Sequence, residues 1–312
     1  MTRRMFPVLE KLTLWILISF SGCAFSQTNF VVRALPAGEV EIPILFRNAI
    51  APPARYRVIF IPGSDCAGMQ PIADRYFRGL LHAEVLVLHK PGIDLLAGPS
   101  PKSCSNEFVQ WDALSRWADT ARVALESDLA SRVPLPQVLV GVSEGAEILP
   151  LLAGGMYNIG ALVLISSSGL DPREAGEMQA YRLGEETAWR ELSERVASTE
   201  RNESLYQGRT LRYWRDMWSW SVTPALLKSN VPVMQIWGSA DESIPERAYL
   251  KFEALAARES ALTNSTGQLC IHRIEAADHG LQSSKRDGLQ WLWAQLERWA
   301  HAPSGSPCTL KY

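Results

Sequence analysis

One serine in this sequence stands where a nucleophile could work. Ser143 lies between Gly141 and Gly145, directly after the apolar run at residues 137–142. A serine nucleophile must be exposed, next to a base and close to donors for an oxyanion. A sharp turn from a strand into a helix that begins at Glu144 exposes it, and side chains at positions 141 and 145 would collide there. Because G-x-S-x-G is common by chance, a polar residue in an ordinary tight turn is the alternative.

An acid and a base follow this serine in the expected order. Asp241 comes after the apolar residues 233–237, and His279 comes after residues 271–275. A nucleophile at such a turn expects first an acid and then a histidine, each after a strand. The other four histidines lie before the serine, within a strand or in the tail, so His279 is the candidate base. Asp171 is the alternative acid.

Two backbone amides must stabilise the oxyanion. We expect the amide of Glu144, directly after the serine, and one from the loop that follows residues 57–61. In this loop Ser64 is the first choice and Asp65 the second, and a purely structural turn is the alternative. The sequence shows neither a zinc-ligand spacing nor a glycine-rich phosphate loop, so we expect neither metal nor organic cofactor.

These motifs resemble the α/β-hydrolase superfamily over nearly the whole chain. The segment from Gly141 to Pro150 is similar to a bacterial esterase and peptidase-like group with the pattern Gly-His-Ser-Glu-Gly-Gly, except that Val142 replaces the histidine. Asp241 and His279 match the G-x-x-D-x-x-x-P and D-H-G segments of that group. Pro-Gly at 62–63 replaces the His-Gly of many lipases and esterases. The resemblance implies two-step acyl transfer by a Ser-His-Asp triad on a mainly parallel sheet.

The hydrophobic pattern independently predicts an α/β fold, with a mainly parallel central sheet flanked by helices. Two extended segments, 30–33 and 40–46, flank a turn at 36–38 and suit an antiparallel start. Three- and four-residue spacing predicts one buried helix stripe from Phe108 to Leu125, and another from Leu289 to Trp299. The expected later strands are residues 57–61, 85–89, 137–142, 160–166, 231–237 and 270–275.

The segment from about 170 to 230 is too long for a simple crossover. It is helical in composition and rich in tryptophan and tyrosine, so we expect an inserted cap over the carboxyl ends of the strands. Trp214 and Trp218 stand four residues apart, which favours packing onto the main domain. Lining of a substrate pocket is the second explanation for these rings.

The first 26 residues predict a secretory signal. Basic residues precede a short apolar stretch at 12–20, followed by small residues. Ala24-Phe-Ser26 before Gln27 forms an ordinary cleavage site, whereas Phe20-Ser-Gly-Cys23 resembles a lipoprotein box that would make Cys23 a lipidated N-terminus. An uncleaved anchor is a third possibility. The hydrolase domain is expected to cover residues 28–312.

Cysteine usage favours export. Four cysteines remain after the signal, and oxidising compartments favour disulfides. We expect Cys66 to pair with Cys104 and Cys270 with Cys308, because each pair would tie a loop next to an active-site strand. Four buried free thiols are the alternative. The expected location is the periplasm or the exterior, with membrane attachment only through a lipid on Cys23.

Composition excludes few functions but does limit the partners. The chain has 312 residues, a formal net charge of -2 and no basic tract, so we expect no nucleic-acid partner.

The predicted protein is an exported serine hydrolase that cleaves an ester-like bond in a small acyl substrate. A peptidase or thioesterase on the same fold is one alternative, and a non-catalytic binding protein is another. The oligomeric state is left open.

Overall fold

The computed structural model describes residues 29–98, 104–263, 269–301 and 306–309. The expected signal segment and Cys23 lie outside these residues. Within the described ranges, no helix combines the length and the apolar character that crossing a membrane requires.

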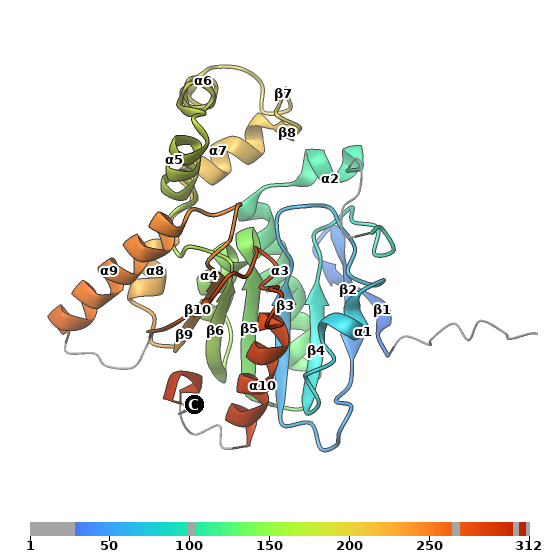
Figure 1. Cartoon of the computed structure of the whole chain (residues 1–312). Coiled ribbons are helices and arrows are strands. Elements are labelled where there is room, and N and C mark those ends of the chain that lie inside the picture. Colours follow the sequence, from blue (N-terminus) through green and yellow to red (C-terminus); the bar gives the residue numbers. More distant parts are fainter. Residues whose placement is uncertain (1–28, 99–103, 264–268, 302–305, 310–312) are drawn as a thin grey trace, which may run out of the picture.

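In the described part of the chain, eight strands form one twisted sheet at the centre of the molecule (Figure 1). Their order across the sheet is β1-β2-β4-β3-β5-β6-β9-β10. β1 and β2 are antiparallel, β2 is antiparallel to β4, and the remaining neighbours are parallel. This agrees with the expected mainly parallel sheet and antiparallel start. The strands are β1 (Val31–Ala37), β2 (Val40–Arg47), β3 (Tyr56–Ile61), β4 (Ala83–Leu88), β5 (Gln137–Val142), β6 (Ile159–Ile165), β9 (Val233–Gly238) and β10 (Leu269–Ile274).

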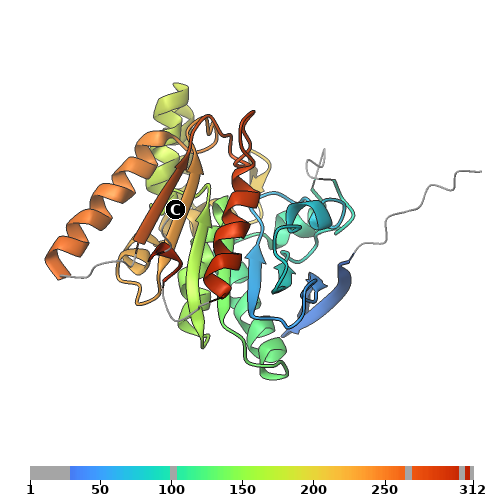
Figure 2. The ribbon, with the colours of Figure 1, turned by 60° about the horizontal axis from the view of Figure 1, so that its bottom comes forward.

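Helices cover both faces of the sheet because successive residues of its central strands point to opposite sides. In β3, Ile59 and Ile61 pack into the core under α3, whereas Val58 and Phe60 pack into the core under α10. Figure 2 shows α10 lying across one face of the strands. The helices of one face are α3 (Leu114–Ala130), α4 (Leu149–Gly154), α8 (Thr223–Leu227) and α9 (Glu246–Thr263), and those of the other are α1 (Ala73–Tyr76) and α10 (Gly288–Ala300).

The single helix expected from Phe108 to Leu125 is wrong. Two helices, α2 (Asn106–Trp111) and α3, are separated by Asp112 and Ala113, which are both extended. The buried carboxylate of Asp112 pairs with Lys90, so a tertiary ion pair rather than helical periodicity sets the path here. The early turn also shifts, because residue 36 still belongs to β1 and the chain reverses at Gly38, with φ of 70°.

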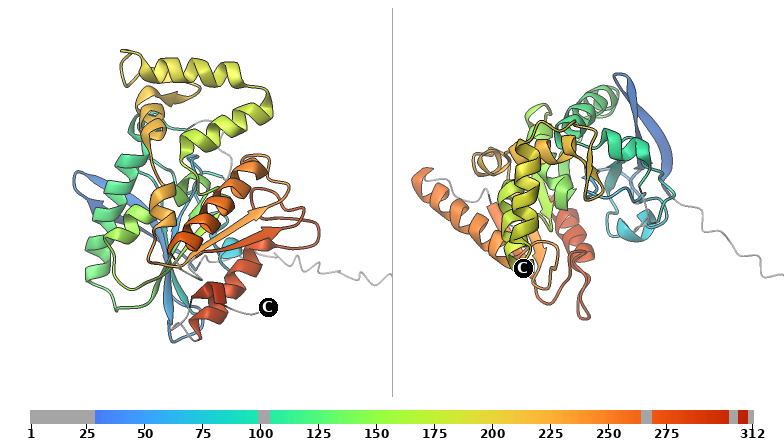
Figure 3. Two further views of the ribbon diagram at one scale, coloured as in Figure 1. Left: turned by 90° about the vertical axis from the view of Figure 1, so that its left-hand side faces the viewer. Right: turned by 90° about the horizontal axis from the view of Figure 1, so that it is seen from above.

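The segment between β6 and β9 forms a largely helical layer beyond the carboxyl ends of the strands (Figure 3). The rings of Trp218 and Trp189 pack in a tilted arrangement with centroids 4.8 Å apart, and Trp214 donates to the carbonyl of Tyr206. Both tryptophans are partly buried against the core, in agreement with packing as their first role. The elements of this layer, here called the cap, are α5 (Pro172–Leu183), α6 (Glu186–Ala197), β7 (Leu205–Tyr206), β8 (Arg209–Thr210) and α7 (Leu211–Ser219).

Among the described residues, two disulfides join the cysteines in the expected pairs. Cys66 bonds to Cys104, and Cys270 bonds to Cys308. The first ties the loop after β3 to the segment before α2, and the second ties β10 to the C-terminal tail. Both bonds are typical of an oxidising compartment.

Candidate active site

Ser143 lies at the carboxyl end of β5 in a backbone conformation that is uncommon for serine. Its φ is +51°, in the left-handed region. The chain then forms a 3₁₀ helix over Ser143–Ile148 before α4 begins at Leu149. A helix thus follows the strand directly, as expected, but its first part is a 3₁₀ helix. Pro150, which has no amide hydrogen, occupies the first turn of α4, where none is needed.

The two glycines that flank the serine are required by close backbone contacts. A Cβ on Gly141 would lie 2.4 Å from the Cα of Ala146, inside the turn itself. A Cβ on Gly145 would lie 2.2 Å from the carbonyl oxygen of Pro62, at the end of the neighbouring strand β3. The turn and the loop after β3 thus touch each other through their backbones.

Two further loops bring His279 and Asp241 together at the same edge of the sheet. The Nδ1 of His279 lies 3.0 Å from Oδ1 and 2.9 Å from Oδ2 of Asp241. β9 and β10 are parallel neighbours, so the loops at their carboxyl ends are adjacent. The hydroxyl of Ser166, at the end of β6, donates to the carbonyl of His279 at 2.7 Å and fixes the histidine loop.

The Asp241 carboxylate is almost fully buried and accepts several hydrogen bonds. The amides of Ser243 and Ile244 donate to Oδ1 at 2.7 and 3.1 Å, and the Tyr249 hydroxyl donates to Oδ2 at 2.8 Å. Burial raises the pKa of Asp241, but the bond to His279 and these amides lower it more, so its pKa lies below the ordinary value. An ionised carboxylate only accepts, so Nδ1 of His279 carries a proton, and in the neutral imidazole the lone pair is on Nε2.

The alternative acid, Asp171, is engaged elsewhere. Its carboxylate accepts hydrogen bonds from the amides of Val222 and Thr223 at 2.7 and 2.8 Å, at the start of α8. Asp171 therefore fixes the return of the chain from the cap to the sheet, and the structure pairs His279 with Asp241 instead.

Ser143 and His279 line one cavity of about 370 Å³. Most of its wall comes from the loop between β3 and α1, which includes the two candidates for the second oxyanion amide. A Cβ on Gly63 would lie 3.6 Å from the Cβ of Ser143, so this loop runs directly past the serine. The lining residues are Pro62, Gly63, Ser64, Asp65, Ala67, Gly68, Met69, Ile72, Val142, Ser143, Ser243 and His279.

A buried histidine holds part of this cavity wall from behind. Nε2 of His89 accepts the amide of Met69 at 3.2 Å. Burial lowers the pKa of His89 to about 4, so the ring is neutral and can accept this bond at ordinary pH. His89 directly follows strand β4 and precedes the serine in the chain.

Several residues around the site had no clear signal in the sequence. Tyr249 reaches Asp241 from α9, and Arg209 reaches the loop after β3 from the cap. Lys90 pairs with Glu144, the residue after the serine, at 2.5 Å. A charged residue two positions after β4 was a usable hint for Lys90, but nothing local marked Arg209 or Tyr249. Within the described ranges, no three His, Cys, Asp or Glu side chains gather as metal ligands would.

The chain matches no family model and no curated protein. Its structure is similar to the esterase domain of a Rhodothermus marinus protein, with a TM-score of 0.56 and 12% identity over 88% of this chain and 98% of that one. Mouse alpha/beta hydrolase domain-containing protein 10 gives 0.55 and 16% over 88% and 100%. Acylaminoacyl peptidase of Pyrococcus horikoshii gives 0.56 and 10% over 88% and 42%. The chain therefore has the α/β-hydrolase fold.

Proposed function

We propose that this protein is an exported serine hydrolase that cleaves carboxylic ester-like bonds through an acyl-enzyme intermediate. The observation that carries the proposal is the juxtaposition of Ser143, in its left-handed turn, with a His279 that is hydrogen-bonded to a buried Asp241. Serine and imidazole line the same cavity, and the carboxylate fixes the tautomer that a general base requires.

In the first half-reaction, Oγ of Ser143 attacks the substrate carbonyl while Nε2 of His279 takes its proton. The tetrahedral intermediate collapses, the bond to the leaving alcohol breaks, and His279 returns the proton to the alcohol oxygen. Water then attacks the acyl carbonyl and loses a proton to His279. The bond from the acyl carbon to Oγ of Ser143 breaks, and His279 returns the proton to Oγ. The products are a carboxylic acid and the free serine. Asp241 keeps its negative charge and stabilises the imidazolium in both steps.

The oxyanion is held by the backbone amides of Glu144 and Ser64. Glu144 directly follows the serine at the start of the 3₁₀ helix, and Ser64 lies in the loop that passes Ser143. Amides fixed before the reaction stabilise developing charge without reorganisation, and loss of one donor costs about 10²–10³ in kcat.

The bond cleaved is an ester in preference to a thioester or an amide. An esterase domain and a peptidase share this fold among its structural neighbours, so the discrimination lies in the cavity and the cap. Besides His279, the cavity is lined by small residues, by the apolar Pro62, Met69, Ile72 and Val142, and by Asp65, whose carboxylate accepts the amide of Ala67. This mainly apolar lining suits a short uncharged acyl group. Both disulfides support an exported protein, and the segment at residues 1–26 is its proposed signal.

The test is covalent labelling of the purified mature protein by a fluorophosphonate, which reacts with activated serines. Wild type should become labelled with one probe per chain, and Ser143→Ala should not. Ser243→Ala is a matched control, because this serine lines the same cavity but reaches Asp241 through its backbone amide, which alanine keeps.

A separate, unlabelled sample of wild type should hydrolyse short p-nitrophenyl esters faster than the corresponding thioesters and anilides. Faster cleavage of anilides would replace the esterase with a peptidase. A folded wild type that is neither labelled nor active would contradict the proposal and favour a non-catalytic binding protein.

A further inference from the structure

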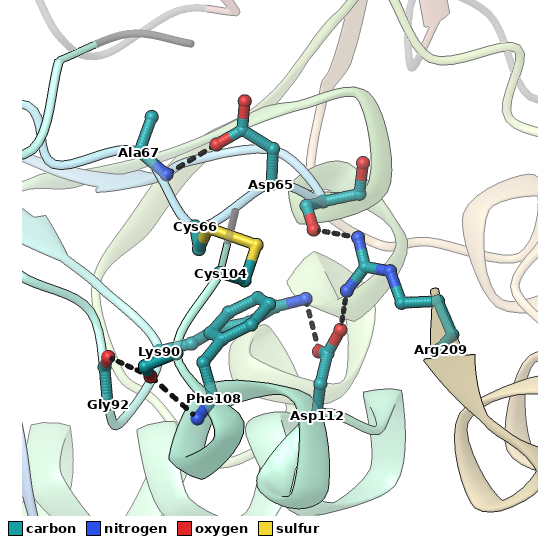
Figure 4. Close-up of a disulfide and its surroundings, with 11 residues drawn as sticks. Asp65, Cys66, Ala67, Lys90, Gly92, Cys104, Phe108, Asp112 and Arg209 are labelled. Atoms are coloured by element: carbon teal, nitrogen blue, oxygen red, sulfur yellow. Dashed lines mark hydrogen bonds and ion pairs between the residues drawn. A yellow bond between two sulfur atoms is a disulfide. The ribbon is translucent and has the colours of Figure 1, made fainter. Parts of the chain in front are cut away.

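A chain of buried ionic groups connects the two residues proposed to supply the oxyanion amides. At one end, the guanidinium of Arg209 donates to the carbonyl of Ser64 and pairs with the carboxylate of Asp112. At the other end, the ammonium of Lys90 lies 2.7 Å from Asp112 and 2.5 Å from Glu144. Figure 4 shows Arg209 reaching Asp112 beside the disulfide of the loop after β3.

The charges in this chain, here called the ion network, balance. Arg209 and Lys90 carry two positive charges, and Asp112 and Glu144 carry two negative ones. The side chains of Asp112 and Lys90 are 0% and 1% exposed, so both depend on their partners for solvation. Breaking one buried pair leaves an uncompensated charge, which is strongly destabilising. The four side chains of the network therefore hold one another in place.

Arg209 comes from the cap, and its position there is well determined. A two-residue turn, Gln207 and Gly208 with φ of 49° and 76°, joins β7 to β8 and begins β8 at Arg209. Positive φ at both residues is typical of the tightest hairpins. The guanidinium lies over the Tyr213 ring at 4.7 Å, and the Tyr213 hydroxyl donates to Glu144 at 2.5 Å. The cap therefore contacts both ends of the ion network.

We propose that Arg209 is a cap-borne positioning residue that holds the oxyanion loop in its reactive conformation. The inference rests on the proposed function. Arg209 does not touch the substrate, and it acts through the Ser64 carbonyl that it fixes. A planar guanidinium can bind this carbonyl and the Asp112 carboxylate together, which ties the loop after β3 to the same network that holds Glu144.

The physical consequence is a link between cap docking and catalysis. Oxyanion donors are effective only when they are aimed before the charge develops, and a misplacement of about 1 Å can cost about 100-fold in rate. Without Arg209, the Ser64 carbonyl loses its cationic partner, and the loop is held by its disulfide, its backbone contacts and the bond from Met69 to His89. The cap thereby acts on the oxyanion site through Arg209.

The test compares Arg209→Gln with Arg215→Gln in hydrolysis of a short p-nitrophenyl ester. Arg215 is a matched control, because it also holds backbone carbonyls, those of Val196 and Ser198, but entirely within the cap. Rates are expressed per site labelled by the fluorophosphonate, so misfolded molecules do not count. Arg209→Gln should lower kcat about 10- to 100-fold with little change in KM, whereas Arg215→Gln should keep kcat.

A second readout separates positioning from general packing. Binding of a trifluoromethyl ketone, whose adduct with serine carries an oxyanion, should weaken in Arg209→Gln by the same factor as kcat/KM falls. Arg209→Lys should be intermediate, since a single ammonium cannot hold both partners. If Arg209→Gln does not fold, the double variant Arg209→Gln/Asp112→Asn removes both charges of the pair and should show the same loss of kcat.

The outcomes that overturn the inference are distinct from those that overturn the function. Equal kcat in Arg209→Gln and Arg215→Gln, or a change confined to KM, contradicts the positioning role while the hydrolase stands. An unlabelled wild type contradicts the hydrolase and the inference together.

Discussion

At the residue scale, the hydrogen bonds around Asp241 decide which nitrogen of His279 is free. Two backbone amides point at Oδ1, so the group at this position must be an acceptor. The remaining oxygen faces the imidazole and the Tyr249 hydroxyl. The site therefore demands a carboxylate by geometry as well as by charge.

This geometry predicts the effect of Asp241→Asn. The two amides will hold the asparagine oxygen, which turns its amide nitrogen toward His279 and forces Nδ1 to accept. Nε2 then carries a hydrogen and cannot take the serine proton, so kcat should fall about 10³- to 10⁴-fold with the fold intact. Ester hydrolysis with circular dichroism checks this.

The neighbouring Glu242 provides the control for this experiment. Its side chain is exposed on the same loop, so Glu242→Gln should change kcat less than about threefold. An Asp241→Asn variant that keeps a tenth of the wild-type kcat would contradict the assignment of Asp241 as the acid of the triad.

At the element scale, the turn after β5 is built against the end of β3. Gly145 meets the carbonyls of Pro62 and Ile61, and the loop that follows them forms most of the cavity wall. The distance between these two elements sets the distance between the serine and the loop that carries Ser64. Adding one methyl group at Gly145 should therefore change both the free energy of unfolding and the geometry of the site.

Gly145→Ala should destabilise the protein by about 2–3 kcal/mol or more, because the added methyl would overlap backbone that cannot rotate away. Gly154→Ala is the matched control in the adjoining helix α4, where a Cβ meets no atom within 4 Å. Alanine favours a helix over glycine by up to about 1 kcal/mol, so this variant should be neutral or more stable.

Urea unfolding measures both variants against wild type. Equal unfolding free energies for Gly145→Ala and wild type would contradict a fixed backbone contact between the turn and the end of β3, because the two would then move apart at no cost.

At the scale of the whole molecule, two disulfides close loops of the same length in different places. Both have a sequence separation of 38 residues. Cys66 adjoins the cavity loop, whereas Cys308 fastens the C-terminal tail to β10, away from the site. Removing each disulfide in turn therefore distinguishes stabilisation of the whole fold from positioning of the cavity loop.

Loop-closure entropy predicts that each disulfide contributes about 4 kcal/mol to the free energy of unfolding. Cys66→Ala/Cys104→Ala and Cys270→Ala/Cys308→Ala should therefore lose similar stability. Only the first should also lower kcat, because it frees the loop that carries Ser64. Unfolding curves and ester hydrolysis per labelled site test this, and equal kcat in the two variants would contradict it.

The sequence by itself determined the order of elements and the residues that meet at the edge of the sheet. Ser143, Asp241 and His279 each follow a strand, and parallel strands present their carboxyl ends at one edge, so local spacing sufficed to bring them together. The sequence pattern likewise predicted all strands of the central sheet but the first to within one or two residues, whereas β1 runs four residues further than expected.

Only the tertiary structure decided how the helix after β4 breaks, where the 3₁₀ helix replaces an α-helix and which charges surround the serine. Arg209 and Ser64 are 145 residues apart, and Lys90 and Glu144 are 54 apart. Local patterns report local interactions, whereas a buried ion network forms wherever folding brings opposite charges together without water. Its members come from β8 and from the ends of β4, α2 and β5, so no local pattern in the sequence could reveal it.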